Sequence, residues 1–281
     1  MTKDYNVIKE YKKLLKIIYD SGKIAKYYFS NDVNVQIKKD KTELTQADLE
    51  IHDFLKKNIK ETYFNYEVIS EENNNEENIQ IIEKDSFFII DPIDGTKSFI
   101  NRSIDFSINL SLIKNEAILF SSIYLPMEDK MYIADERFSY LIRSYNDYTN
   151  NIYNKICSKK KIFKSNIDVL CTKRNEEFLE IKKFLKQSSK KISYHNIASS
   201  KKFCLISEGF YDVYIRKVNI KIWDIVSGFH IARNSGLVIE DLHGVNIYKK
   251  IISKKYLNEI SKNGFKIDKF IIKRCNLKLF N

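Results

Sequence analysis

Long apolar runs are absent from this chain. None reaches the roughly 18 consecutive apolar residues that a membrane-spanning helix needs, and residues 1–6 lack the apolar core of a signal peptide. We therefore expect no membrane span and no export, which places the protein in the cytoplasm. Apolar residues still make up 43% of the 281 positions, enough to bury a large core in one domain or in two packed lobes.

Cysteine and histidine are also few, and their spacings exclude two kinds of framework. The four cysteines are far apart and form no C-x-x-C pair, so we interpret them as reduced thiols and small apolar fillers. The four histidines show no zinc-ligand spacing with each other or with a cysteine. The sequence therefore predicts neither disulfides nor a structural zinc site.

Arginine, proline and glycine are scarce as well. The chain has 7 arginines against 41 lysines, with 2 prolines and 7 glycines, and it is rich in Asn and Ile. Such a composition is typical of drift in an AT-rich genome. The net charge of +11 would suit a polyanion, but arginine is the residue favoured for contacts with phosphates and bases. We expect no specific nucleic-acid partner, and we leave open a weak association with the anionic cytoplasmic side of the inner membrane.

Amphipathic helical patterns alternate with short apolar runs along the chain. The helical patterns lie at 5–29, 45–59, 175–185, 200–208 and 222–234. The strand-like runs lie at 67–70, 87–90, 105–113, 117–124, 131–134, 168–171, 211–216 and 237–240. The acidic stretch 71–78 has no apolar period and predicts a loop. The alternation in 105–113 predicts a sheet that packs on one face.

This order of elements predicts a layered α/β (α+β) architecture. Residues 144–166 are polar and rich in Lys and Asn, so we expect a boundary there. The N-terminal α+β lobe would span 1–145 and carry the site, and a C-terminal α/β lobe at 146–281 would close it.

Two carboxylates and a tight turn follow the apolar run 87–90, in the stretch 91–99 with the sequence DPIDGTKSF. The proline fixes its own φ and the glycine permits backbone geometry that other residues resist, so Asp91 and Asp94 are held close together. Converging acids repel unless a cation lies between them, and Mg²⁺ is the usual cation for oxygen-only ligands. Thr96 can cap the next segment, and amides at a helix start suit a phosphate. The motif predicts a metal and a phosphate in one site.

Three further acids occur in informative surroundings. Glu71 follows the strand-like run at 67–70, so it falls beside Asp91 if the two strands are neighbours; alternatively it begins an acidic surface loop. Asp224 lies at the start of a mostly apolar helix, where a carboxylate stabilises the helix dipole. Asp48 belongs to a capping-like pattern. Each of the last two could be a helix-start acid and nothing more.

These patches, in this order, resemble the inositol monophosphatase superfamily, and within it the bacterial 3'(2'),5'-bisphosphate nucleotidases. The matching strings are LTQAD (44–48), VISEE (68–72), DPIDGTKSFINR (91–102), SSKKFCLISEG (199–209) and IWD (222–224). The DPIDGT element is highly specific for the superfamily, and the resemblance covers roughly residues 5–250, nearly the whole chain. It implies the layered αβαβα sandwich of the sugar phosphatases.

The resemblance also implies two or three Mg²⁺ ions. Glu71 and Asp91 would hold one ion with the carbonyl of Ile93, while Asp91, Asp94 and Asp224 would hold a second, and a third, weaker ion would lie near Glu71. Clustered ions suit phosphate-monoester hydrolysis because they lower the pKa of water and stabilise the attacking and leaving oxygens.

Roles in catalysis and substrate binding follow from the same resemblance. Thr96, oriented by Asp48, would help to activate the attacking water, and the amides of Gly95 and Thr96 would hold the scissile phosphate. The catalytic residues would be Asp48, Glu71 and Thr96. The substrate would be contacted by Glu71, Ile93, Asp94, Gly95, Thr96, Lys202, Arg216 and Asp224.

The substrate we expect depends on residues 214–221. Inositol monophosphatases usually place an acid there to bind inositol hydroxyls, whereas this stretch is cationic, which suits a second phosphate. Lys202 and Arg216 are our candidates for the adenosine and phosphate pocket, and either could instead be a solvated surface charge. We therefore expect Mg²⁺-dependent removal of the 3'-phosphate from adenosine 3',5'-bisphosphate, giving AMP and phosphate.

Two rival functions stay open. One is an inositol- or sugar-phosphate phosphatase with the same metal centre. The other is a basic protein with a residual fold that binds polyanions or a membrane surface. For the enzyme, the resemblance implies clearance of a by-product of sulfate activation and sensitivity to lithium. Its partner would be a small nucleotide bisphosphate, and we expect a monomer or a homodimer.

Overall fold

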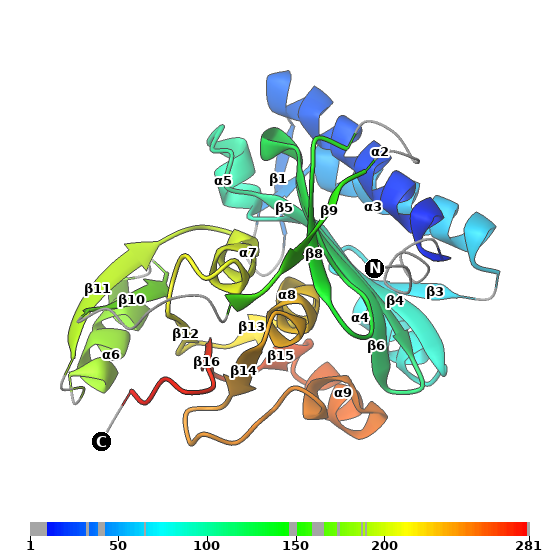
Figure 1. Cartoon of the computed structure of the whole chain (residues 1–281). Helices are drawn as coiled ribbons and strands as arrows, with labels where there is room; N and C mark the ends of the chain where they lie inside the picture. Colours follow the sequence, from blue (N-terminus) through cyan, green and yellow to red (C-terminus); the bar gives the residue numbers. More distant parts are fainter. Residues whose placement is uncertain are drawn as a thin grey trace.

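The computed structural model of the chain describes residues 10–31, 34–38, 43–64, 66–145, 151–158, 166–172, 175–186, 188 and 190–279. Its elements stack in layers (Figure 1): a pair of helices, a large sheet, a second pair of helices, a smaller sheet and, on the far side of that sheet, the helix Asn175–Leu185. This is the αβαβα order that we expected from the sequence.

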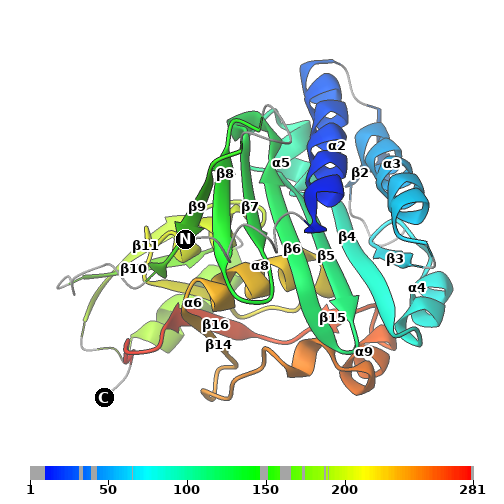
Figure 2. The same cartoon turned by 45° about the vertical axis from the view of Figure 1, so that its right-hand side comes forward.

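The first layer consists of α2 (Lys12–Ser30) and α3 (Gln46–Thr62), which pack side by side against one face of the large sheet (Figure 2). α3 begins with a capping box, in which the Thr45 side chain and Asp48 exchange hydrogen bonds with each other's backbone amides. The expected helix start at Thr45 is therefore confirmed. Between the helices, β1 (Val35–Ile37) and β2 (Glu43–Thr45) pair antiparallel. Of the helix predicted over 5–29, residues 5–9 lie outside the described residues.

Within the described residues, seven strands form the large sheet in the order β3-β4-β5-β6-β7-β8-β9. They are β3 (Glu67–Ser70), β4 (Ser86–Asp94), β5 (Ser107–Lys114), β6 (Ala117–Leu125), β7 (Lys130–Ala134), β8 (Ser139–Arg143) and β9 (Tyr153–Ile156). β3 and β4 are parallel, and the other neighbours are antiparallel. α5 (Thr96–Ile100) follows β4, and the 3-10 turn η1 (Pro126–Glu128) follows β6.

The connection between the two parallel strands corrects one expectation. It contains α4 (Asn75–Ile82), although we predicted a loop over 71–78. The Asn74 side chain accepts a hydrogen bond from the Glu77 amide and so caps the helix. The buried apolar residues of this helix, Ile81 and Ile82, come after the stretch 71–78 in which we found no apolar period. The helix starts with polar residues, and the hydrophobic pattern of 71–78 therefore did not predict it.

The large sheet packs on both faces, which corrects a second expectation. Phe106, just before β5, and Ile108, Leu110 and Leu112 on β5 face the core beneath α2 and α3, as the alternation predicted. The opposite face carries Ser107, Asn109 and Ser111, and these side chains are also buried. They form hydrogen bonds with Ser200 at the N-cap of α7, with α8 and with the sheet itself. The polar residues that suggested a solvent-facing surface therefore belong to a helix–sheet interface.

The remaining layers follow in the second half of the chain. α7 (Lys201–Ser207) and α8 (Ile222–Asn234) lie between the two sheets (Figure 1). Among the described residues, the smaller sheet has the order β11-β10-β12-β16-β14. Its strands are β10 (Asn166–Cys171), β11 (Lys191–Asn196), β12 (Val213–Arg216), β14 (Leu237–Glu240) and β16 (Phe270–Arg274). The other elements are α6 (Asn175–Leu185), β13 (Ile220–Lys221), η3 (Lys250–Ile252), α9 (Lys254–Ser261) and β15 (Lys266–Ile267).

Close contact between α7 and α8 depends on Gly228. A Cβ atom at this position would lie 2.2 Å from the ring of Phe203, so only glycine lets the two helices approach this closely. The Phe203 ring in turn packs against Tyr214, Phe229 and Phe270. This aromatic cluster joins the helices to the smaller sheet.

Several composition-based expectations can be compared with the fold. All four cysteines are free in the described chain, and Cys171 and Cys204 are buried. Among the described residues, none of the helices combines the length and apolar character that crossing a bilayer requires. The large sheet extends to Ile156 and the smaller sheet begins at Asn166; the division into lobes at 145 and 146 stays a prediction.

Candidate active site

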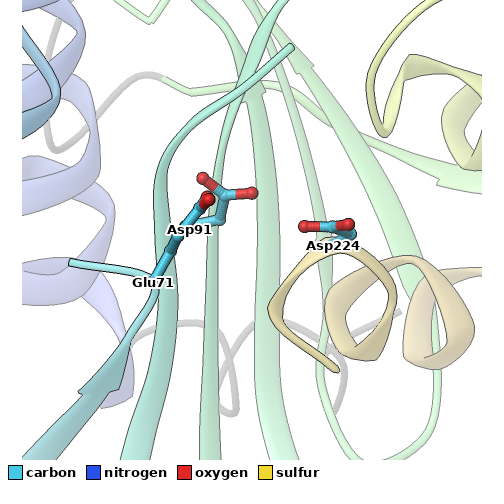
Figure 3. Close-up of side chains that lie close together, drawn as sticks. All are labelled: Glu71, Asp91 and Asp224. Atoms are coloured by element: carbon cyan, nitrogen blue, oxygen red, sulfur yellow. The ribbon is translucent and has the colours of Figure 1, made fainter. Parts of the chain in front are cut away.

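Parallel pairing of β3 and β4 brings two acids together. Ser70 lies opposite Ile90 in the register of the two strands, so the next residues, Glu71 and Asp91, emerge side by side at the same end. The first turn of α8 adds Asp224 from the other side (Figure 3). Among the described residues, these three acids form a cluster in which one carboxylate oxygen from each lies within 4.8 Å of the others. The expectation that the two strands are neighbours is confirmed.

The acids of this cluster are held in an unfavourable environment. Burial raises the pKa of Asp91 well above its usual range, and repulsion from Glu71 and Asp94 adds to the effect. Burial likewise raises the pKa of Asp224, with further repulsion from Asp94 and Glu71. The pKa of Glu71 is raised mainly by burial, while Lys38 opposes the shift.

These residues fit a divalent cation. Asp91 is 1% exposed, and its Oδ1 atom has no hydrogen-bond partner among the described residues. A buried carboxylate oxygen without a partner is costly, and here it is surrounded by other acids. The donors are all oxygens, which is the set that Mg²⁺ prefers. A cation among Glu71, Asp91 and Asp224 would satisfy the unpaired atom and offset the repulsion.

The stability of the metal-free protein should fall as the pH rises. The raised pKa values mean that the folded protein binds more protons than the unfolded chain, so their contribution to stability is fully present below the unfolded-state pKa values near 4 and is lost as the pH rises through the raised folded-state values. For Asp48, burial raises the folded-state pKa to about 6. Denaturant unfolding between pH 5 and 8, in EDTA and in Mg²⁺, would measure the effect. We expect stabilisation by Mg²⁺ to grow with pH, and equal stabilisation at both ends would contradict the cluster's role.

The turn after β4 places further candidates beside the cluster. The β4–β5 register shifts between Asp91 and Asp94, and Gly95 follows with φ 92°, a left-handed conformation that favours glycine. A Cβ there would lie 3.1 Å from the carbonyl oxygen of Asp105 and 3.2 Å from the Cβ of Ser199. The Thr96 hydroxyl donates to the carbonyl of Ile93 at 3.1 Å. The turn thus keeps Asp94, Thr96 and the Ile93 carbonyl next to Asp91.

Asp48 lies near these acids but has other hydrogen-bond partners. Its Oδ2 accepts from the Thr45 amide at 2.8 Å and from the Thr45 hydroxyl at 2.5 Å. Glu71 contributes to its raised pKa, so the two carboxylates are close enough to repel. In the described part of the chain no hydrogen bond joins Asp48 to Thr96, and orientation of Thr96 by Asp48 stays a prediction.

Lys202 and Arg216 are buried, at 6% and 7% exposure, so neither is a solvated surface charge. The Nζ atom of Lys202 donates to the carbonyls of Ile197 and Ser199 at 3.1 and 2.7 Å, and burial lowers its pKa to about 8. The Nε atom of Arg216 lies 3.2 Å from Oε1 of Glu177. Asp94 and Asp224 raise the pKa of Lys202 against the effect of burial, so this cation lies within electrostatic reach of the acids.

Two charged residues near the site were missed by the sequence reasoning. The Lys38 ammonium lies 3.5 Å from Glu71 and 2.8 Å from Glu72, a contact across distant segments that no local pattern reveals. The Glu177 side chain is fully buried beside Arg216, and its carboxylate also accepts from the Lys217 amide at 2.8 Å. The sequence did contain a signal for the burial of Glu177, because this residue lies on the same face of α6 as the buried Ile181 and Leu185.

Comparison with known proteins bears on this geometry. Residues 9–264 match the model of the inositol monophosphatase family. The chain belongs to the inositol monophosphatase family. It is 30% identical over 237 residues to the 3'(2'),5'-bisphosphate nucleotidase CysQ of Buchnera aphidicola, covering 82% of this chain and 83% of that protein. The resemblance to this family that the sequence motifs indicated is confirmed.

Solved structures agree on the fold. The crystal structure of CysQ from Bacteroides thetaiotaomicron superposes with a TM-score of 0.74 at 19% identity, covering 98% of this chain and 99% of that one. An IMPase/NADP phosphatase complexed with Mg²⁺ and phosphate superposes with a TM-score of 0.72 at 17% identity, covering 96% and 92%. The protein is an enzyme, a phosphatase of the bisphosphate nucleotidase type, in a family that is metal-dependent.

Proposed function

We propose that this enzyme removes the 3'-phosphate from adenosine 3',5'-bisphosphate in a Mg²⁺-dependent reaction, giving AMP and phosphate. The observation that carries the proposal is the juxtaposition of an acidic cluster with two buried cations, Lys202 and Arg216. The cluster suits cation-assisted hydrolysis of a phosphate monoester. The buried cations suit a substrate that brings a second phosphate.

The residues that would hold two or three ions are Glu71, Asp91, Asp94, Asp224 and the carbonyl of Ile93. Bound there, Mg²⁺ would lower the pKa of water and stabilise the charge of the attacking and leaving oxygens. The protein's part is to hold these oxygen donors at fixed separation at the junction of β3, β4 and α8. No histidine is required as a general base.

The turn at residues 94–96 would handle the scissile phosphate. The amides of Gly95 and Thr96 begin α5, where backbone N–H groups lack partners within the helix. The Thr96 hydroxyl would help to orient the attacking water, and it now donates to the Ile93 carbonyl. A role for Asp48 is supported by its burial, which raises its pKa to about 6 and brings its proton exchange close to neutral pH.

The buried cations would select the rest of the substrate. Lys202 is fixed by two carbonyls through two of its three N–H groups. Arg216 is paired through Nε with Glu177, and the planar fork of a guanidinium suits a phosphate. A neutral inositol ring would offer these cations no partner, and this favours the nucleotide over the inositol phosphates.

A substrate panel tests the proposal. We expect kcat/KM in Mg²⁺ to be about tenfold or more higher for adenosine 3',5'-bisphosphate than for adenosine 3'-monophosphate, because hydrogen bonds to charged groups contribute about 1.5–3 kcal/mol. Arg216→Lys should reduce this preference with little change for the monophosphate, since Lys lacks the planar fork. Arg233→Gln, at an exposed position of α8, is the control.

Other outcomes of the panel would decide between the rivals. A clear preference for inositol 1-phosphate would favour the inositol- or sugar-phosphate phosphatase. Salt-sensitive polyanion binding without Mg²⁺-dependent phosphate release would favour the basic protein that binds polyanions or a membrane surface. Membership of this enzyme family already argues against that rival. Inhibition by Li⁺, a role in sulfur metabolism, the cytoplasmic location, any membrane association and the monomeric or dimeric state stay predictions.

A further inference from the structure

A neutral hydrogen-bonded chain connects the large sheet to the first turn of α8. Asn109 lies on β5 directly opposite Asp91 of β4, and it is 1% exposed. Its amide nitrogen donates to the Ser200 hydroxyl at 2.9 Å and approaches Oδ2 of Asp94 at 3.5 Å. Its amide oxygen accepts from the Ser107 hydroxyl at 3.2 Å. One side chain thus contacts the sheet, an acid and the start of α7.

Ser200 continues the chain to the other half of the site. Its hydroxyl donates to the backbone carbonyl of Asp224 at 2.9 Å, and the residue is 1% exposed. A carbonyl can only accept, so this hydroxyl must donate to Asp224 and accept from the Asn109 amide. The reverse amide orientation would place an oxygen against the Asp94 carboxylate. The direction of every bond is therefore determined, and none depends on a titrating proton.

The acids of the cluster come from two separate parts of the fold and repel one another. Glu71 and Asp91, like the neighbouring Asp94, are attached to the large sheet, whereas Asp224 is attached to α8. One carboxylate oxygen from each of Glu71, Asp91 and Asp224 lies within 4.8 Å of the others, and repulsion between the ionised groups would drive the helix away from the sheet. A neutral link at the level of the acids opposes this separation without adding charge.

We infer that Asn109 and Ser200 are positioning residues that set the separation between Asp224 and the sheet-borne acids, and thereby the affinity for a divalent cation. This inference rests on the cation site of the proposed function and not on the identity of the substrate. Groups that orient metal ligands commonly change affinity on the order of tenfold when removed.

The chain offers a matched control one step along the same face of β5. Ser111 is fully buried and bonds to Ser227 of α8 and to Ser121 of β6, both at 2.8 Å. It therefore also joins the large sheet to α8 through neutral hydroxyls. None of its described hydrogen bonds involves an acid of the cluster. Loss of Ser111 should affect stability and leave cation affinity unchanged.

Cation binding without substrate tests the inference. Mn²⁺ titration by calorimetry and thermal unfolding in EDTA would be measured for the wild type, Asn109→Ala, Ser200→Ala and Ser111→Ala. We expect Mn²⁺ affinity to fall on the order of tenfold in the first two variants and to stay within about twofold in Ser111→Ala, with comparable losses of thermal stability. Excess Mg²⁺ should restore most of kcat in Ser200→Ala.

Failures of the two proposals can be distinguished. If the wild type binds no divalent cation, the proposed function fails as well. If it binds the cation and all three variants bind equally well, only the positioning role of Asn109 and Ser200 is refuted. Should Asn109→Ala not fold, Ser200→Ala decides alone, because it removes a single hydroxyl.

Discussion

Asp91→Asn should abolish phosphatase activity and, in the absence of metal, make the protein more stable. Asp91 is the buried member of the acidic cluster, and an amide is a far weaker ligand for Mg²⁺ than a carboxylate. Cation chemistry contributes several kcal/mol to such reactions and 1.36 kcal/mol corresponds to tenfold in rate, so we expect a loss on the order of a thousandfold. Mg²⁺-dependent phosphate release measures it.

The gain in stability has a separate cause. In the metal-free protein, burial and repulsion from Glu71, Asp94 and Asp224 disfavour ionised Asp91, and the neutral amide removes this cost. The effect should increase with pH, because a larger fraction of wild-type Asp91 must ionise at higher pH and ionisation is unfavourable in the folded state. Denaturant unfolding in EDTA at pH 5 and pH 8 would show it.

A matched substitution distinguishes this effect from the general cost of altering a buried acid. Asp135 is 2% exposed, and its Oδ1 atom accepts from the amides of Arg137 and Phe138 at 2.8 and 2.7 Å, two bonds that Oδ1 of Asp91 lacks. Asp135→Asn should therefore destabilise the protein under the same conditions. Near-normal turnover in Asp91→Asn, or a loss of stability as large as that of Asp135→Asn, would contradict the cluster's role as a cation site.

Gly228→Ala should destabilise the protein by about 2 kcal/mol, although alanine is normally the better helix former. Gly to Ala within a helix is favourable by roughly 1 kcal/mol, but the added Cβ would lie 2.2 Å from the Phe203 ring. Overpacking of this kind costs about 1–3 kcal/mol or more, because Phe203 is held by Tyr214, Phe229 and Phe270. Thermal and denaturant unfolding would give the sign and the size.

This substitution should also weaken the site. α7 begins just after Ser200 and α8 carries Asp224, so spreading the two helices would lengthen the hydrogen bond between these residues. The double variant Gly228→Ala with Phe203→Leu should recover part of the lost stability, since the two changes act on one contact. Strictly additive losses, or a stabilised Gly228→Ala variant, would show that the helices are not in close contact there.

The parts of the site predicted from sequence are those in which neighbouring residues carry the signal. The stretch 91–99 contains a strand end, two acids and a turn, and the Asp48 capping pattern predicted the start of α3. Glu71 was less certain from its own surroundings, because an acidic run can also be a surface loop. Its place became definite only with the pairing of β3 and β4.

The parts of the site that were not predicted from sequence depend on contacts between distant segments. Lys38 and Glu71 belong to different elements, and the role of Asn109 depends on Ser200, which lies far along the chain. On β5, Ser107, Asn109 and Ser111 had the spacing of a solvent-facing strand surface, and only the position of α8 shows that they are buried. A polar residue in a strand does not reveal whether its partner is water or another helix.

The parallel pairing of β3 and β4 has a consequence for the order of folding. The pairs from β5 to β8 are antiparallel neighbours in sequence and can form as hairpins from local contacts. β3 and β4 can pair only after the chain has crossed over through α4, and α8 must then arrive from much farther along the sequence. Contacts between distant segments form slowly. We therefore expect the cation site to be completed late in refolding, so that divalent cations slow unfolding far more than they speed folding.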